Sequence, residues 1–195
     1  MGHVAHPGIQ REAYISVDVE TSGPNPGDYD LLSIGACRVD DYTQGFYVEL
    51  QPVRCNAIPG SLAISGLSMQ ALAETGVPPG KAMAQFEAWL HDVVSDSERP
   101  VFVALNAPFD WMFVSDYFHR YLSRNPFGHS ALDIKAFYMG LAGVHWAQTS
   151  MRVFGARYLD GRKLTHNALQ DARDQAEVFS HILEEARSRF QGTNS

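Results

Sequence analysis

The sequence has few cysteines, no long apolar run and no excess of positive charge. Its two cysteines, Cys37 and Cys55, form no C-x-x-C pair, which excludes a disulfide scaffold and favours free thiols in a reducing compartment. No stretch approaches the ~20 apolar residues of a helical membrane span, so we expect no membrane partner. A formal net charge of −7 argues against a protein that wraps duplex nucleic acid through its backbone.

The composition that remains is that of a globular protein. Hydrophobic residues make up 45% of the 195 positions, which is enough for a sizeable core and fits one domain. The stretch Met1–Gln10 is polar and lacks the apolar centre of a signal peptide. We therefore expect a flexible N-terminal tail over residues 1–12, a single domain over 13–190 and a cytoplasmic location.

Hydrophobic periodicity predicts strands first and alternating strands and helices afterwards. The expected strands cover residues 13–19, 31–39, 45–51, 101–105 and 130–133. The expected helices cover residues 68–74, 80–95, 108–123, the segment through Leu141, and 167–189. Short links between the first three strands indicate a meander. This order predicts an α/β fold in which a mixed sheet carries helices on its faces.

The first acidic pair lies in the first expected strand. Asp18 and Glu20 are two residues apart, so their carboxylates share one face of the strand. Two like charges this close favour a divalent cation, which takes carboxylate oxygens as ligands. Alternation with Ile15, Val17 and Val19 would equally produce an ordinary half-exposed strand. The pair alone leaves both interpretations open.

Two further acidic elements follow. Asp110 comes just after an apolar strand, where ligands gather in open α/β sheets. Asp171 begins the last helix, and His166 stands just ahead of it. Acids at helix starts also interact well with the helix dipole, so a structural role for Asp110 and Asp171 stays open at this point.

Taken together, three motifs resemble one family. Asp18-Val19-Glu20-Thr21 resembles D-x-E-T, residues 106–110 resemble N-A-x-F-D, and His166 with Asp171 resembles H-x-x-x-x-D. Each motif is weak alone, but their order, spacing and structural context are specific. The chain resembles the DEDDh branch of the DEDD 3′–5′ exonucleases over about residues 13–185. That branch includes proofreading subunits of bacterial replicative polymerases, ribonuclease T and oligoribonuclease.

The resemblance implies a fold and a mechanism. The fold is ribonuclease H-like, with a five-stranded mixed sheet flanked by helices. Asp18, Glu20, Asp110 and Asp171 would hold two Mg²⁺ or Mn²⁺ ions, and His166 would be the general base. The enzyme would release nucleoside 5′-monophosphates from the 3′ end of single-stranded DNA or RNA.

The resemblance also implies substrate contacts. Thr21, Ser65, Asn106 and Phe109 would bind the 3′-terminal nucleotide. Ser65 and Leu105 stand where family members often have histidine, so the strength of substrate binding and the choice of substrate stay open. The basic residues Arg152, Arg157, Arg162 and Lys163 would either meet the nucleic acid backbone or lie in a solvated loop.

Other interpretations keep the same fold but change the function. One is a catalytically idle nucleic-acid-binding module, and another is an accessory module of a polymerase. Family members act as homodimers or as polymerase partners, so the resemblance leaves both assemblies open. The choice between DNA and RNA depends on contacts with the 2′-hydroxyl, which the sequence does not place.

Overall fold

The computed structural model describes residues 10–162 and 165–192. Five strands form one sheet in the order β3-β2-β1-β4-β5. Their bounds are β1 Arg11–Thr21, β2 Leu31–Arg38, β3 Gly45–Glu49, β4 Glu98–Ala104 and β5 Ala131–Asp133. The first three strands are an antiparallel meander, and β4 and β5 run parallel to β1. The sheet is therefore mixed, as the alternation of elements predicts.

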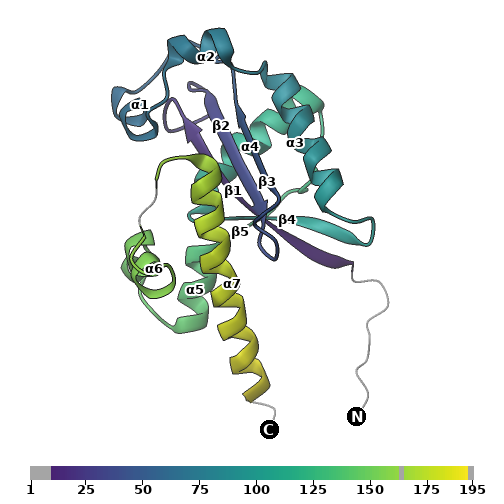
Figure 1. Cartoon of the computed structure of the whole chain (residues 1–195), viewed down its shortest axis with the longest axis vertical. Helices are drawn as coiled ribbons and strands as arrows, with labels where there is room; N and C mark the ends of the chain where they lie inside the picture. Colours follow the sequence, from purple (N-terminus) through teal and green to yellow (C-terminus); the bar gives the residue numbers. More distant parts are fainter. Residues whose placement is uncertain (1–9, 163–164, 193–195) are drawn as a thin grey trace.

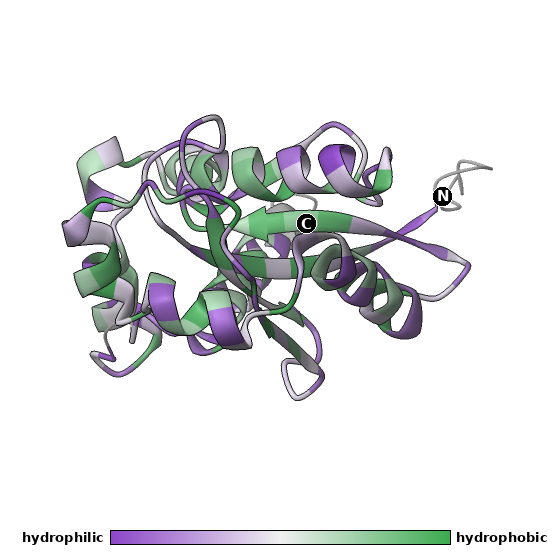
Figure 2. Cartoon of the chain, turned by 90° about the horizontal axis from the view of Figure 1, so that it is seen from above, coloured by the Kyte–Doolittle hydropathy of each residue, from purple (hydrophilic) through white to green (hydrophobic). Residues whose placement is uncertain are grey.

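The helices lie on both faces of this sheet (Figure 1). Their bounds are α1 Pro59–Ser65, α2 Met69–Thr75, α3 Pro79–Val93, α4 Ala107–Leu122, α5 Ile134–Ala142, α6 Met151–Tyr158 and α7 Ala168–Gly192. Helix α7 crosses one face with α5 and α6 beside it, and α3 and α4 cover the other face. Seen from above, largely hydrophobic strands lie between helices in which hydrophobic and hydrophilic residues alternate (Figure 2).

The two faces of β1 carry different side chains and pack against different helices. Ile15, Val17 and Val19 are buried and join Phe86 of α3 and Phe113 of α4 in one core cluster. The opposite face carries Asp18 and Glu20, and α7 packs on this side of β1 and β2. The polar face is thus covered by a helix, which an ordinary half-exposed strand would not be.

The first turn of helix α7 packs directly against Gly35 of β2. This residue pairs with Asp18 across the antiparallel ladder. A Cβ atom at Gly35 would lie 2.1 Å from the carbonyl carbon of Ala168 and 2.2 Å from the amide nitrogen of Leu169. The missing side chain therefore admits the first turn of α7 directly beside the strand that carries the acidic pair.

The loop between β1 and β2 is fixed by a buried carboxylate. Asp30 accepts hydrogen bonds from Nη1 of Arg54 at 2.8 Å and from the backbone amides of Val53 and Arg54 at 3.1 and 2.7 Å. The hydroxyl of Tyr117 on α4 donates to it at 3.3 Å. Because Asp30 is fully buried, these bonds replace its hydration and hold the loop against α4.

Some expected boundaries were wrong. Strand β1 begins at Arg11, so residues 11 and 12 belong to the sheet rather than to an N-terminal tail. Residues 1–9 of that expected tail lie outside the described residues. Helices α1 and α6 were not expected, because short helices with few buried residues leave little periodic signal.

Both cysteines lie in the part of the chain that the structure describes. Cys37 is buried and Cys55 is exposed, and both are free thiols. None of the helices in the described ranges combines the length and the apolar character that a membrane crossing requires.

Candidate active site

Four carboxylates from three elements meet at the end of the sheet where α7 begins. Asp18 and Glu20 lie on β1, Asp110 lies in the first turn of α4, and Asp171 lies in the first turn of α7. Asp110 and Asp171 are buried, with 5% and 1% of their surfaces exposed. The structure therefore brings together acids that are about 90 and 150 positions apart in the chain.

Neutral hydrogen-bond donors hold the carboxylates of Asp110 and Asp18. Oδ1 of Asp110 accepts the backbone N–H of Val19 at 3.1 Å, which ties α4 to β1 between the acidic pair. Oδ1 of Asp18 accepts a hydrogen bond from Nε2 of Gln175 on α7 at 2.6 Å. These donors orient the carboxylates without neutralising their charge.

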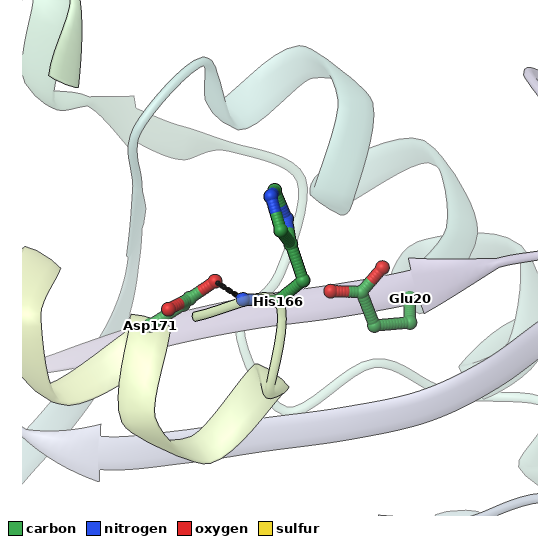
Figure 3. A group of neighbouring side chains, drawn as sticks. All are labelled: Glu20, His166 and Asp171. Atoms are coloured by element: carbon green, nitrogen blue, oxygen red, sulfur yellow. Dashed lines mark hydrogen bonds between the residues drawn. The ribbon is translucent and has the colours of Figure 1, made fainter. Parts of the chain in front are cut away.

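Asp171 organises the turn that precedes α7. Its carboxylate accepts the backbone N–H and the hydroxyl of Thr165 at 2.7 and 3.0 Å, and the backbone N–H of His166 at 2.9 Å. His166 is exposed and has a φ of 56°, a left-handed conformation that is uncommon for a side chain of this size. Figure 3 shows the resulting group, in which the Glu20 carboxylate points toward His166.

Burial and mutual repulsion disfavour ionisation in this group. Burial, followed by the nearby carboxylates of Asp110, Asp171 and Glu20, raises the pKa of Asp18 well above its usual value. Burial and then the Asp171 carboxylate raise the pKa of Glu20 to about 7.

Asp110 is shifted in the same direction. Burial raises the pKa of Asp110 to about 8, against the lowering effect of the Val19 amide, with smaller contributions from Glu20 and Asp133. Clustered carboxylates with raised pKa values are a recurring property of functional sites.

This donor set suits hard divalent cations. One ligand atom each from Glu20, His166 and Asp171 lies within 4.8 Å of the others, a cluster that can hold a metal ion. A bound divalent cation would offset the repulsion that raises the pKa of Asp18, and carboxylate oxygens are the ligands that Mg²⁺ and Mn²⁺ prefer. The residues present therefore fit the metal expected from the sequence.

Two polar residues near the acids were not expected from the sequence. Asp133 ends β5, caps α5 through the N–H of Ala136 at 2.7 Å, and accepts the N–H of Ala107 at 2.6 Å. A helix-cap signal could have found Asp133, because it directly precedes an apolar helix. Gln175 follows Asp171 by four positions on α7, so helical spacing alone places the two on one face.

The four expected substrate residues differ in their exposure and in their own contacts. The Thr21 hydroxyl donates to the carbonyl of Gly23 at 2.9 Å. The Ser65 hydroxyl makes its hydrogen bonds within and just after α1. Asn106 is exposed, has a φ of 68° and precedes α4. Phe109 is half-buried, with its ring centroid 5.5 Å from that of Phe113.

Two of the basic residues ahead of His166, Arg157 and Arg162, bind acids of α7. Arg157 contacts Glu185 at 2.9 Å. Arg162 contacts Asp174 at 2.8 Å and also pairs with Glu177. These ion pairs attach α6 and the turn after it to α7. Lys163 lies outside the described residues.

Comparison with known proteins identifies relatives over most of the chain. Residues 13–183 match the 3′–5′ exoribonuclease Rv2179c-like domain family. The 3′–5′ DNA exonuclease Cap18 of Escherichia coli is 44% identical over 172 residues, which cover 88% of this chain and 92% of that protein. Ribonuclease T of Shewanella sp. (strain ANA-3) is 31% identical over 182 residues, covering 87% and 81%.

Solved structures share the fold at low sequence identity. The nuclease domain of 3′hExo, a DEDDh family member bound to rAMP, superimposes with a TM-score of 0.73 at 13% identity, covering 90% of this chain and 93% of that one. Exonuclease I of E. coli, in complex with a dT13 oligonucleotide, gives 0.70 at 16% identity, covering 93% and 43%. The expected ribonuclease H-like fold is confirmed. The chain belongs to the 3′–5′ exoribonuclease Rv2179c-like domain family and is a 3′–5′ exonuclease.

Proposed function

We propose that this exonuclease degrades single-stranded nucleic acid from its 3′ end and releases nucleoside 5′-monophosphates with the help of divalent cations. The observation that carries the proposal is the convergence of Asp18, Glu20, Asp110 and Asp171 around a partly buried centre beside His166. Their hydrogen-bond donors are neutral, so the negative charge of the group is left for cations to balance.

In this proposal the four carboxylates hold the metal ions. Two divalent cations, when bound, would activate a water molecule and neutralise charge on the scissile phosphate. The fourfold negative charge of the site would then be cancelled before substrate arrives. The phosphate of an incoming strand would not be repelled, although the whole chain carries a net charge of −7.

His166 is the proposed proton acceptor. It is exposed and close to Glu20 and Asp171, while its backbone is fixed through its own N–H. An imidazole nitrogen would take the proton of the attacking water as its oxygen bonds to phosphorus. The bond from phosphorus to the 3′-oxygen of the penultimate nucleotide breaks, and that oxygen takes up a proton from solvent. The products are a nucleoside 5′-monophosphate and a strand one nucleotide shorter.

We propose DNA as the preferred substrate. The relative named as a DNA exonuclease is 44% identical, whereas the ribonuclease T relative is 31% identical. The family description names exoribonucleases, so the rates of cleavage of DNA and of RNA have to be compared in one assay. Phe109 and Asn106, the half-buried ring and the exposed amide beside Asp110, are the proposed contacts of the terminal nucleotide, with Thr21 and Ser65 completing its surroundings.

The test uses 5′-labelled strands of one sequence as single-stranded DNA, single-stranded RNA and duplex DNA, with Mn²⁺ or Mg²⁺. We expect shortening from the 3′ end that is faster on single-stranded DNA, and complete loss with EDTA or with Asp18→Asn. Asp92→Asn, an exposed acid on α3, is the matched control and should keep full activity. Full activity of Asp18→Asn would refute the metal-site assignment.

The role of His166 has its own test. His166→Ala should retain Mn²⁺ binding and lose most turnover at saturating substrate, while His119→Ala, an exposed histidine on α4, should behave as wild type. Unchanged turnover of His166→Ala would remove it as the base. A homodimer, a polymerase partner and a cytoplasmic location stay predictions, and size-exclusion chromatography of the purified chain tests the first.

A further inference from the structure

Gln175 is a buried amide in contact with one of the four acids. Its side chain lies on α7 one helical turn after Asp171, and only 2% of the residue is exposed. Nε2 donates to Oδ1 of Asp18 at 2.6 Å, and Oε1 accepts the backbone N–H of Leu105 at 2.8 Å. Both polar ends of the amide are therefore satisfied by groups on other elements.

The orientation of this amide is dictated by its partners. A backbone N–H can only donate, so the carbonyl oxygen of Gln175 must face Leu105. The NH₂ group must then face Asp18, where it donates to a carboxylate oxygen. A flipped amide would set two donors against each other at Leu105 and two acceptors against each other at Asp18. The contact with Asp18 is thus a directed one.

We propose that Gln175 is a positioning residue for cation binding, which fixes Oδ1 of Asp18 and leaves Oδ2 to the metal. This inference rests on the proposed function. A carboxylate without such a partner turns about its terminal torsion and presents either oxygen. Holding one oxygen removes that freedom before the cation arrives. Hydrogen-bond partners of metal ligands commonly have this task.

The second hydrogen bond extends the effect to Asp110. Leu105 follows directly after β4 and precedes Asn106, the N-cap residue of α4. Through this N–H, Gln175 fixes the junction from which α4 carries Asp110 into the site. One amide thereby touches or anchors the three elements that supply all four acids.

The experiment compares Gln175→Met with wild type. Methionine has a similar length and is apolar, so it fills the space without either hydrogen bond. Binding of Mn²⁺ to the substrate-free protein is measured by calorimetry, and kcat and KM are measured against Mn²⁺ concentration. We expect the Mn²⁺ dissociation constant to rise about 10-fold or more, within the range for lost partners of metal ligands. The KM for the oligonucleotide at saturating Mn²⁺ should stay within about twofold of wild type.

Gln170→Met is the matched control. Gln170 lies on the same helix, and its amide also donates to a carboxylate, that of Asp174 at 3.0 Å. Asp174 is not one of the four acids, so this variant should bind Mn²⁺ as wild type does. Gln175→Asn keeps an amide but is one methylene too short to span both partners, so it should also weaken Mn²⁺ binding. It serves as the second variant if Gln175→Met folds poorly.

The outcomes separate the two proposals. Wild type that cleaves and binds Mn²⁺, with Gln175→Met and Gln175→Asn within twofold of its affinity, overturns the role of Gln175 and leaves the proposed function standing. Equal weakening by Gln170→Met overturns the positioning role as well, because the loss would then not depend on contact with Asp18. Wild type that neither binds Mn²⁺ nor cleaves overturns the proposed function, and the role of Gln175 with it.

Discussion

Substituting Gly35 by alanine should separate the two acids of β1 from Asp171 of α7. The new Cβ would lie 2.1 Å from the carbonyl carbon of Ala168, whereas ordinary contacts begin at 3.4 Å. The close atoms all belong to the backbone of α7, so no side-chain rotation can relieve the clash. Helix α7 must therefore move away from β2 by about 1.3 Å. Gly35 pairs with Asp18, so the retreat opens the site at its centre.

We expect Gly35→Ala to lose activity without losing its fold. A misplacement of about 1 Å at reacting groups lowers rates by on the order of 100-fold. Overpacking by one methyl group costs about 1–3 kcal/mol of unfolding free energy, which a domain stable by ~5–15 kcal/mol tolerates. Gly35→Ala should thus remain folded and lose about two orders of magnitude in kcat.

The assay is single-turnover cleavage of a 5′-labelled strand, with urea unfolding measured in parallel. Gly140→Ala in α5 is the control, because no atom lies within 4 Å of its added Cβ. It should keep full activity and gain up to ~1 kcal/mol of stability from helix propensity. Gly35→Ala with activity within threefold of wild type and unchanged stability would refute the reasoning.

Three further predictions concern stability, pH and substrate. Asp30→Asn should cost about 3 kcal/mol in urea unfolding, because it weakens a buried ion pair, while Asp28→Asn, which is exposed, should cost almost nothing. Without metal, the pKa of Glu20 is raised from 4.5 to about 7 and that of Asp110 from 3.8 to about 8. Because the pKa of each group is higher in the folded than in the unfolded chain, both groups stabilise the fold at low pH. This stabilisation is lost as the pH rises through about 7 and about 8, so the free energy of unfolding in EDTA should fall from pH 5 to pH 8.5. A free energy of unfolding that stays constant over this pH range in metal-free wild type would contradict this expectation. Phe109→Ala should raise KM about 5- to 100-fold if its ring stacks on a base, in steady-state assays at fixed Mn²⁺, and an unchanged KM would exclude stacking.

The acids and the histidine could be singled out because three short motifs, in a specific order and spacing, resemble those of the DEDDh exonucleases. Asp18 and Glu20 alternate with apolar residues in a strand, and Asp171 begins the helix with the clearest apolar stripe. The meander of the first three strands follows from the short links between them, and the mixed sheet from the later alternation of strands and helices. These patterns depend on residues close together in the chain, which is why sequence carries them.

The contacts that orient the acids could not be predicted in the same way. Gln175 looks like any polar residue of a helix until Leu105 and Asp18 are brought to it from 70 and 157 positions away. Arg162 looked free to meet a nucleic acid, yet acids of α7 occupy its guanidinium. Such partnerships depend on side-chain geometry in three dimensions.

The covering of β1 by α7 has a consequence for when activity can begin. A ribosome synthesises Asp18 and Glu20 early, and Asp171 about 150 residues later. Until α7 docks on the sheet, Asp171 does not stand beside the other three acids, and Asp18 lacks its hydrogen-bond donor Gln175. A metal site that uses all four carboxylates would therefore form only when α7 docks on the sheet, after the last of these acids has been synthesised.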